Sequence, residues 1–202
     1  MLQGHQTWLF SSQPVITATG TAVGPLEGEG PLGKEFDIIH GDPWVGQDSW
    51  EKAEKRLLED ACEKAIEKAG LEKQDVQLFI GGDLLSQLIS SNFAARTLAM
   101  PFLGMFAACA TSTASLALAA LLVDGGYAHT VMHGTSSHNA AAEKQFRYPT
   151  EYGGQKPPTA QWTVTGAGIA IVQNKEMAKQ PSTLKITSAT IGRVVDMGLS
   201  DP

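Results

Sequence analysis

The chain has few cysteines and no cluster of basic residues, and both absences exclude classes of protein. Only two cysteines, Cys62 and Cys109, occur in 202 residues, which argues against a disulfide-stapled fold and fits a reducing compartment. The 15 Lys and Arg are outnumbered by 21 Asp and Glu, giving a formal net charge of −6. Without a concentrated basic patch, we expect no binding to nucleic acid.

Signals for membrane insertion are weak. The first ten residues lack a basic region followed by a long apolar stretch, so no secretion signal is expected. One run of 22 residues, Phe102–Val123, carries no charge and is long enough to cross a bilayer. Its centre, around Cys109, contains too many Thr and Ser for a membrane span. We interpret the run as a buried strand, a tight turn and a buried helix, and expect no transmembrane segment in the chain.

What the sequence does contain is an alternation of strand-like and helix-like apolar segments, with 43% hydrophobic residues to form a core. The clearest helix spans Ser49–Ala69, with Asp48 as the predicted N-cap and Gly70 at its end. A long loop is expected over Pro25–Gly46. The other expected segments are strands at Pro14–Gly24, Val76–Gly82, Phe102–Phe106, Ala128–Gly134, Thr163–Gln173 and Leu184–Val195, and helices at Ser91–Met100 and Ser112–Val123. This order predicts an α/β fold with a mainly parallel sheet covered on both faces.

Cys109 lies at the junction between a predicted strand and a predicted helix, which makes it the first candidate for a functional residue. Unpaired backbone N–H groups and the helix dipole stabilise negative charge at such a junction, so a thiol there becomes more acidic or a carboxylate is held. The residues alone leave three interpretations open: a reactive thiol, a wall of an anion site, or a buried structural thiol. Cys62 lies beside the apolar stripe of a helix and is expected to be structural.

A second group of candidates follows the strand that ends at Gly134. Ligand-contacting residues of α/β proteins cluster at the carboxyl ends of strands. The candidates are His138, Asn139, Glu143, Arg147 and Tyr148. Structural alternatives remain open for them: His138 as a cap of the turn, Glu143 on a solvated helix face, and Arg147 paired with a carboxylate. Asp83, after two glycines, is expected to cap a helix.

A catalytic thiol normally needs a base within hydrogen-bond reach, usually a histidine. The chain has five histidines. They are His5, His40, His129, His133 and His138. Spacing alone assigns none of them as the partner of Cys109.

The arrangement around Cys109 resembles the thiolase superfamily, the fold of ketoacyl-carrier-protein synthases, in which a cysteine follows a buried strand and opens a buried helix. Within that superfamily the chain is similar, over essentially all of its length, to a family of sporulation proteins. The matching segments include SWEKAEKRLLEDA from Ser49, PFLGMFAACATS from Pro101, TSSHNAAAEKQFRYPTEYGGQKP from Thr135 and TVTGAG from Thr163. The resemblance implies a layered αβαβα fold of two similar halves. The chain is expected to be one C-terminally truncated domain, 1–202, that supplies the first half and part of the second, because proteins of this family continue past Pro202. In the related enzymes, the histidine and the histidine or asparagine partners of the cysteine come from the second half.

The resemblance to the sporulation family also implies a function. It implies a protein that binds dipicolinic acid or its calcium chelate and is required, with the membrane subunits of a spore channel, for uptake of dipicolinate into the forespore. It further implies a peripheral location on the spore inner membrane, a homodimer, no cofactor, no metal site and no enzymatic activity. The predicted ligand contacts are Cys109, His138, Asn139, Glu143, Arg147 and Tyr148. Within them, the turn at Cys109 would hold one carboxylate, Arg147 would grip the other and Tyr148 would stack on the ring.

Two other functions are compatible with the sequence. One is an acyltransferase that uses Cys109 as its nucleophile, since the related synthases do so. The other is an architectural subunit that docks other proteins and has lost its ligand. Likeness of fold does not decide among these functions.

Overall fold

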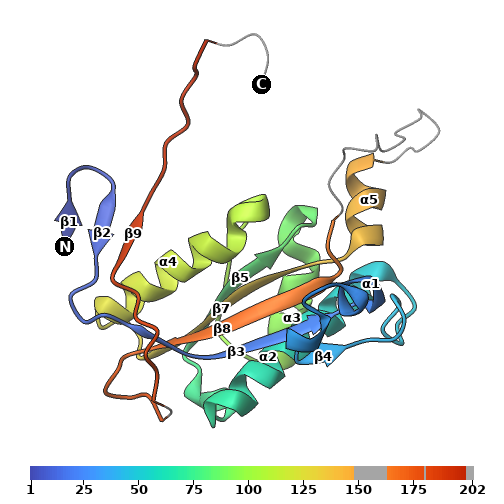
Figure 1. Cartoon of the computed structure of the whole chain (residues 1–202), viewed down its shortest axis with the longest axis horizontal. Coiled ribbons are helices and arrows are strands. Elements are labelled where there is room, and N and C mark those ends of the chain that lie inside the picture. The colour runs from blue at the N-terminus through green and yellow to red at the C-terminus, as the bar shows by residue number, and fades with distance from the viewer. Residues whose placement is uncertain (148–162, 180, 199–202) are drawn as a thin grey trace.

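A computed structural model of the chain describes residues 1–147, 163–179 and 181–198, and its centre is a six-stranded sheet (Figure 1). The strand order is β4-β3-β8-β7-β5-β6. The bounds are β3 Val15–Val23, β4 Ile38–Ile39, β5 Leu78–Asp83, β6 Phe102–Gly104, β7 Thr130–Ser137 and β8 Gly166–Gln173. Three neighbouring pairs are parallel, β3–β4, β5–β6 and β5–β7, whereas β8 runs antiparallel to both β3 and β7. The predicted, mostly parallel sheet is therefore confirmed, with β8 as its antiparallel member.

Helices cover both faces of this sheet, as Figure 1 shows. The α-helices are α1 Pro25–Glu29, α2 Trp50–Ala69, α3 Ile89–Leu98, α4 Thr111–Asp124 and α5 Asn139–Arg147, and the short 3₁₀ helices are Gly33–Glu35, Lys73–Asp75, Ser86–Leu88 and Ala108–Ala110. Consecutive residues of a strand point to opposite faces. Accordingly Phe79 of β5 packs in the core under α2 and α3, and the next residue, Ile80, packs in the core under α4. The described chain thus forms three layers, helix, sheet and helix.

A second, small antiparallel sheet joins the beginning of the chain to a segment near its end. Its strands are β1 Leu2–Gln3, β2 Thr7–Leu9 and β9 Ser188–Thr190, in the order β1-β2-β9. The predicted strand Leu184–Val195 is therefore wrong in extent. Only its centre pairs with β2, and a single bridge joins Lys185 to Val15 of the main sheet. The residues beyond β9 are mostly exposed, so no packing partner fixes them as a strand in the described chain.

Helix α2 begins at a different cap from the predicted one. Ser49, rather than Asp48, is the N-cap, and its hydroxyl accepts a hydrogen bond from the Lys52 backbone N–H. Asp48 instead forms an ion pair with the Lys52 side chain at 2.7 Å. At the other end Gly70 adopts a left-handed φ of 65°, as predicted for the residue that ends the helix. Both ends of the helix therefore have the expected kind of capping residue, but the N-cap lies one residue later than predicted.

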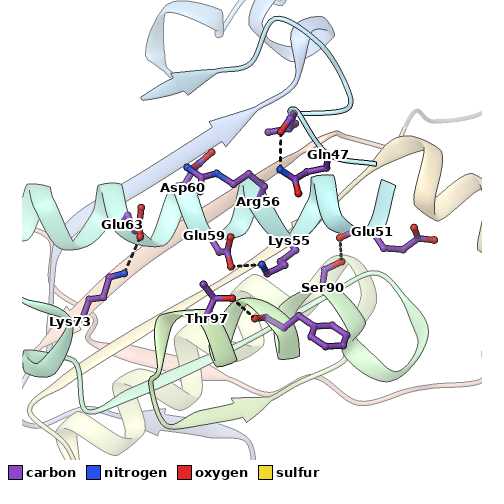
Figure 2. Close-up of polar contacts among 12 residues, drawn as sticks. Gln47, Glu51, Lys55, Arg56, Glu59, Asp60, Glu63, Lys73, Ser90 and Thr97 are labelled. Atoms are coloured by element: carbon purple, nitrogen blue, oxygen red, sulfur yellow. Dashed lines mark hydrogen bonds and ion pairs between the residues drawn. The ribbon is translucent and has the colours of Figure 1, made fainter. Parts of the chain in front are cut away.

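Helix α2 also packs unusually close to the sheet. A Cβ on Gly20 of β3 would lie 2.1 Å from the Ala61 carbonyl oxygen, and Ala53, Ala61 and Ala65 are fully buried on the same side of the helix. On its other side the helix carries ion pairs, including Lys55 to Glu59 at 2.9 Å (Figure 2). Small residues toward the sheet and charged residues away from it explain the orientation of α2.

The predicted loop Pro25–Gly46 contains more structure than expected. Its first residues form α1, and Ile38 and Ile39 form β4, which pairs with the end of β3. The Asp37 carboxylate accepts hydrogen bonds from the backbone and hydroxyl of Thr21 and an ion pair from Lys68. These contacts hold the segment along the sheet edge, so it is ordered although it lacks a long periodic pattern.

Helix α4 departs from the prediction of a buried helix. Five of its residues, Thr111, Ser115, Ala119, Ala120 and Val123, are buried against the sheet. The rest of its apolar surface is half-buried or exposed, and Leu121 is 36% exposed. In the described chain, α4 therefore has one covered face and one apolar face that no described element covers.

Candidate functional site

Cys109 lies in a tight turn between β6 and α4, as the sequence predicts. The turn is a short 3₁₀ helix, Ala108–Ala110, and Ala108 has a φ of 45°, in the left-handed region that disfavours side chains other than glycine. The thiol is free and exposed. A strained backbone conformation directly beside an exposed thiol is typical of a functional turn.

Two glycines of β5 allow the chain to reach this turn. The Met105 N–H donates to the Gly81 carbonyl at 2.8 Å, which brings the segment after β6 against the end of β5. A Cβ on Gly82 would lie 2.0 Å from the Met105 carbonyl oxygen. Only a glycine at position 82 permits this approach, so β5 sets the place at which the Cys109 turn begins.

The start of α4 lacks a capping side chain, although two amides beside it are already used: the Ala110 N–H donates to the Ala107 carbonyl at 2.9 Å and the Thr111 N–H donates to the Ala108 carbonyl. The N-cap of α4, Ala110, makes no side-chain capping hydrogen bond, so the amide groups of the first helical turn have no capping side chain and the positive end of the helix dipole faces the turn. Thr111 stabilises the turn itself: its hydroxyl accepts from the Ala107 N–H at 3.1 Å and donates to the Ala108 carbonyl at 2.8 Å. This geometry favours a bound carboxylate.

The other cysteine has no such surroundings. Cys62 of α2 is fully buried in the core, and burial raises the pKa of its thiol well above the ordinary value. The structure therefore confirms the expectation that Cys62 is a structural side chain.

A histidine of β7 lies under α4. His133 of β7 is 4% exposed, and its Nδ1 lies 3.2 Å from the Ser115 hydroxyl of α4. Its Nε2 has no hydrogen-bond partner in the described residues. Burial lowers the pKa of His133 to about 4, so the ring is neutral near pH 7. No contact between this ring and Cys109 is present, so the geometry does not make it the base of a thiol nucleophile.

His138 and Asn139 lie on the other side of the sheet. The His138 ring is 1% exposed, its Nε2–H donates to the Pro43 carbonyl at 2.8 Å and its Nδ1 accepts from the Ala140 N–H. Asn139 donates through its side chain to the Thr163 carbonyl at 3.1 Å. Both side chains thus fix the start of α5, on the face covered by α2, whereas Cys109 precedes the helix on the opposite face.

The remaining predicted contacts come from α5 and beyond. Glu143 is half-buried on α5, and Lys144 ties the helix to α2 through Glu51 at 3.4 Å. Arg147 ends the helix, but its side chain lies outside the described part of the chain, as does all of Tyr148. The structure brings His138, Asn139 and Glu143 together on one short segment and does not join them to Cys109.

Sequence reasoning missed a buried pair of carboxyl groups next to the strand ends. Glu54 of α2 is fully buried and accepts from the Ser136 hydroxyl at 3.0 Å, while its second oxygen has no partner among the described residues. Burial, reinforced by the charge of Asp83, raises the pKa of Glu54 to about 8. The one indication of this buried carboxyl group in the sequence is that Glu54 directly follows Ala53, one of the small residues of α2 that face the sheet.

Asp83 supports the start of α3, although not as the N-cap that the sequence predicts, since the N-cap of α3 is Leu88. It is 1% exposed, and its carboxylate accepts from the Leu85 N–H and from both the N–H and the hydroxyl of Ser91 at the start of α3. Burial raises the pKa of Asp83, and these hydrogen bonds oppose the increase. The residue therefore fixes α3 against the end of β5.

Comparison with solved structures identifies the class of fold that holds this site. The chain is similar to 3-oxoacyl-[acyl-carrier-protein] synthase III from Aquifex aeolicus VF5, with a TM-score of 0.56, 17% identity, and coverage of 79% of this chain and 53% of that one. It is also similar to Xanthomonas campestris OleA, in a structure with bound lauric acid and lauroyl-CoA, with a TM-score of 0.55, 14% identity, and coverage of 86% and 60%. The fold is therefore thiolase-like, which confirms the predicted fold class.

The sequence places the chain within one family of that class. The profile of the family described as stage V sporulation protein AD matches residues 4–202. Stage V sporulation protein AD of Bacillus subtilis (strain 168) is 50% identical over 201 residues, which cover 100% of this chain and 58% of that protein. The chain belongs to the stage V sporulation protein AD family, as its motifs predicted. It spans a little more than half the length of that curated relative.

No helix in the described residues combines the length and apolar character needed to cross a membrane.

Proposed function

We propose that the protein binds dipicolinic acid during sporulation and that the turn at Cys109 receives one of its two carboxylates. The observation that carries this proposal is the uncapped start of α4 beside an exposed Cys109, on a backbone turn held by Thr111. A small flat dianion suits such a group of amide donors. Membership of the sporulation family supports the choice of dianion.

The second carboxylate and the ring are assigned to the segment after β7. We propose that Arg147 binds the second carboxylate through bidentate hydrogen bonds and that Tyr148 stacks on the pyridine ring of dipicolinate. We propose that His138 and Asn139 serve the site by positioning this segment, because their side chains are already engaged in hydrogen bonds, and that Glu143 on the same helix completes the set. For His138 and Asn139 the supporting contacts are those that fix the start of α5, and hence the position of the segment that carries Arg147.

Calorimetric titration of the full-length protein with dipicolinate tests the proposal. Cys109→Asp places a negative charge at the carboxylate position, and we expect about tenfold or greater loss of affinity. Met177→Asp adds the same charge at an exposed turn near the opposite end of the sheet and is expected to bind like the wild type. Equal affinity of both variants would refute the role of the turn.

The Arg147 part of the site is tested in the same assay. Arg147→Ala is expected to weaken dipicolinate binding by about tenfold or more, because it removes a charge-assisted pair of hydrogen bonds. Lys144→Ala, which removes a cation from the same helix, is the matched control. If both variants bind dipicolinate equally well, Arg147 does not contact it.

The wider role follows as a proposal for the whole protein. The protein binds dipicolinate, alone or as its calcium chelate, and transfers it to the membrane subunits of the spore channel for uptake into the forespore. The protein acts there as a peripheral component of the spore inner membrane, without catalysis. The architectural alternative, a docking subunit that has lost its ligand, predicts no thermal stabilisation by dipicolinate, whereas a ligand selective for the native state raises the melting temperature.

We also propose that two copies of the protein pair through β6. This strand is an edge of the main sheet, and its Leu103 side chain is 44% exposed, with Phe106 beyond it 54% exposed. An open edge with exposed apolar side chains favours addition of another strand. A homodimer formed in this way would bring two Cys109 turns near the shared edge.

An acyltransferase is the second candidate function. The specific observation in its favour is the exposed Cys109 thiol at a strained turn in a thiolase-like fold. Transfer of an acyl group to the thiol would add the mass of that group to the protein. Intact-mass measurement after incubation with acetyl-CoA or lauroyl-CoA separates the functions: a binding protein keeps its mass, and an adduct that Cys109→Ala abolishes would establish the acyltransferase.

A further inference from the structure

A small cavity lies beside the start of α1 and α5, away from the Cys109 turn. Its volume is about 260 Å³, and residues from five separate segments line it. The argument below depends on Glu27 of α1, Trp50 of α2, His138 after β7 and Thr165 before β8. Convergence of distant segments on one concavity is typical of a binding site.

Glu27 gives the cavity an unsatisfied negative group. Its Oε1 accepts from the Thr165 N–H at 2.9 Å, which fixes the carboxylate in place. Its Oε2 is shielded from solvent and, within residues 1–147, 163–179 and 181–198, has no hydrogen-bond partner. No described cation forms an ion pair with it. A shielded carboxylate oxygen without a donor is costly unless a donor arrives from outside.

The neighbouring histidine does not neutralise this carboxylate. The His138 ring already uses both nitrogens, donating to Pro43 and accepting from Ala140. Burial lowers the pKa of His138, although the nearby charge of Glu27 opposes this effect. Near neutral pH the ring is uncharged, so the negative charge in the cavity comes from Glu27.

The other walls are apolar and aromatic. Trp50 stacks on Trp44 with ring centroids 3.4 Å apart and lies 5.1 Å from the His138 ring. These stacking contacts fix the indole of Trp50 at the cavity. An aromatic face next to a carboxylate attracts a flat, delocalised cation, because a guanidinium can stack on the ring while its N–H groups reach the oxygen.

From these contacts we propose that the cavity binds an alkyl guanidinium group. Pockets for whole drug-sized molecules measure about 300–1,000 Å³, and the smaller volume here matches a group the size of a side chain. On binding, the Glu27 side chain turns its shielded Oε2 toward the cavity to accept from the guanidinium, which lies beside the part of Trp50 that Trp44 leaves uncovered, and the alkyl stem contacts the apolar wall. The group comes either from an arginine of a partner protein or from a small molecule that carries the same chemistry.

Titration of the ¹⁵N-labelled full-length protein with N-propylguanidinium tests this proposal. The indole N–H signal of Trp50, assigned with Trp50→Phe, is expected to shift saturably. N-propylurea, which has a similar shape but no charge, is expected to bind at least about tenfold more weakly because the charge-assisted hydrogen bond is lost. A short peptide with one arginine, compared with its citrulline counterpart, then distinguishes a partner's side chain from a free small molecule.

Two variants assign the effect to the cavity. Glu27→Gln keeps an oxygen for the Thr165 N–H but removes the charge, and is expected to weaken N-propylguanidinium binding about tenfold or more. Glu29→Gln, an exposed position at the end of the same helix, is expected to bind like the wild type. The absence of a saturable shift, equal binding of the urea, or unchanged binding by Glu27→Gln overturns the proposal. The comparison of the two probes on the wild type stands even if a variant fails to fold.

Discussion

Buried ionisable side chains make the stability of this protein depend on pH in two opposite directions. Glu54 keeps its proton in the folded state because burial raises its pKa to about 8, and His133 stays neutral because burial lowers its pKa to about 4. Neither residue was a predicted site residue. A sequence does not report how deeply a helix face is covered, and both side chains owe their state to that burial. The structural Cys62 could be anticipated from its place beside the apolar stripe of α2, whereas the contact of Asp83 with Ser91 spans eight residues and is not the N-cap that the sequence predicts.

Glu54→Gln is expected to change the pH dependence of stability. The unfolded state loses this proton above the ordinary pKa of 4.5, but the folded state keeps it up to about 8, so the free energy of unfolding falls over that range. The slope is roughly 1 kcal/mol per pH unit. Urea denaturation from pH 5 to pH 8 should show Glu54→Gln gaining stability relative to the wild type as pH rises. Glu63→Gln, at an exposed ion pair on the same helix, should show no such gain.

His133→Gln is expected to act in the acid range. A histidine whose folded-state pKa is lowered contributes stability above its ordinary pKa of 6.5, and this stability is lost as pH falls toward 4. The difference in unfolding free energy between wild type and His133→Gln should therefore shrink between pH 6.5 and pH 4. His129→Gln, at the exposed position directly before β7, is the control. A constant difference between wild type and His133→Gln would contradict the burial-driven shift.

At the scale of elements, periodic segments could be predicted and short ones could not. The repeating small and apolar residues of α2 predict a helix that the structure confirms, and the strand–turn–helix junction at Cys109 is where the pattern placed it. The two-residue strand β4 has no period to detect and exists because tertiary contacts, such as Asp37 with Thr21, hold it. The helix α4 is apolar on all sides, which predicted complete burial, but coverage depends on neighbours that its own sequence does not describe.

Gly20→Ala tests the close packing of α2 on β3. The added Cβ would meet the backbone oxygen of Ala61 at 2.1 Å, and backbone cannot rotate away as a side chain does. We expect the free energy of unfolding to fall by about 1–3 kcal/mol or more, as overpacking typically does. Gly168→Ala on β8 has open space at its Cβ and is expected to change stability little. Similar denaturation midpoints for the two variants would show that α2 can move away from the sheet.

At the scale of the whole molecule, the alternation of strands and helices predicts the fold class, while the antiparallel insertion of β8 between β3 and β7 is set by chain topology. The two groups of predicted ligand residues lie on opposite faces of the sheet, because β7 directs His138 toward α2 while Cys109 precedes α4. The sequence predicts that both groups follow strands that end at the same edge of the sheet. It does not predict toward which face of the sheet each side chain points. The expected second half of the fold stays a prediction for the full protein.

The proposed pairing through β6 is tested at this scale by sedimentation velocity of the full-length protein. Leu103→Glu places a charge on the open edge and is expected to shift the protein from dimer to monomer. Ile39→Glu, on the opposite edge strand β4 and 48% exposed, is expected to leave the dimer intact. A monomeric wild type, or a dimer that survives Leu103→Glu, would contradict the arrangement.

The most direct test of the central claim is to follow the backbone amide signals of Cys109–Thr113 during titration of the labelled full-length protein with dipicolinate. This segment contains the Cys109 turn and the uncapped start of α4, where we propose that the carboxylate binds. The account predicts large, saturable shifts in this segment, with the same dissociation constant as calorimetry. Binding of dipicolinate with these signals unmoved, or no binding at all, would contradict it.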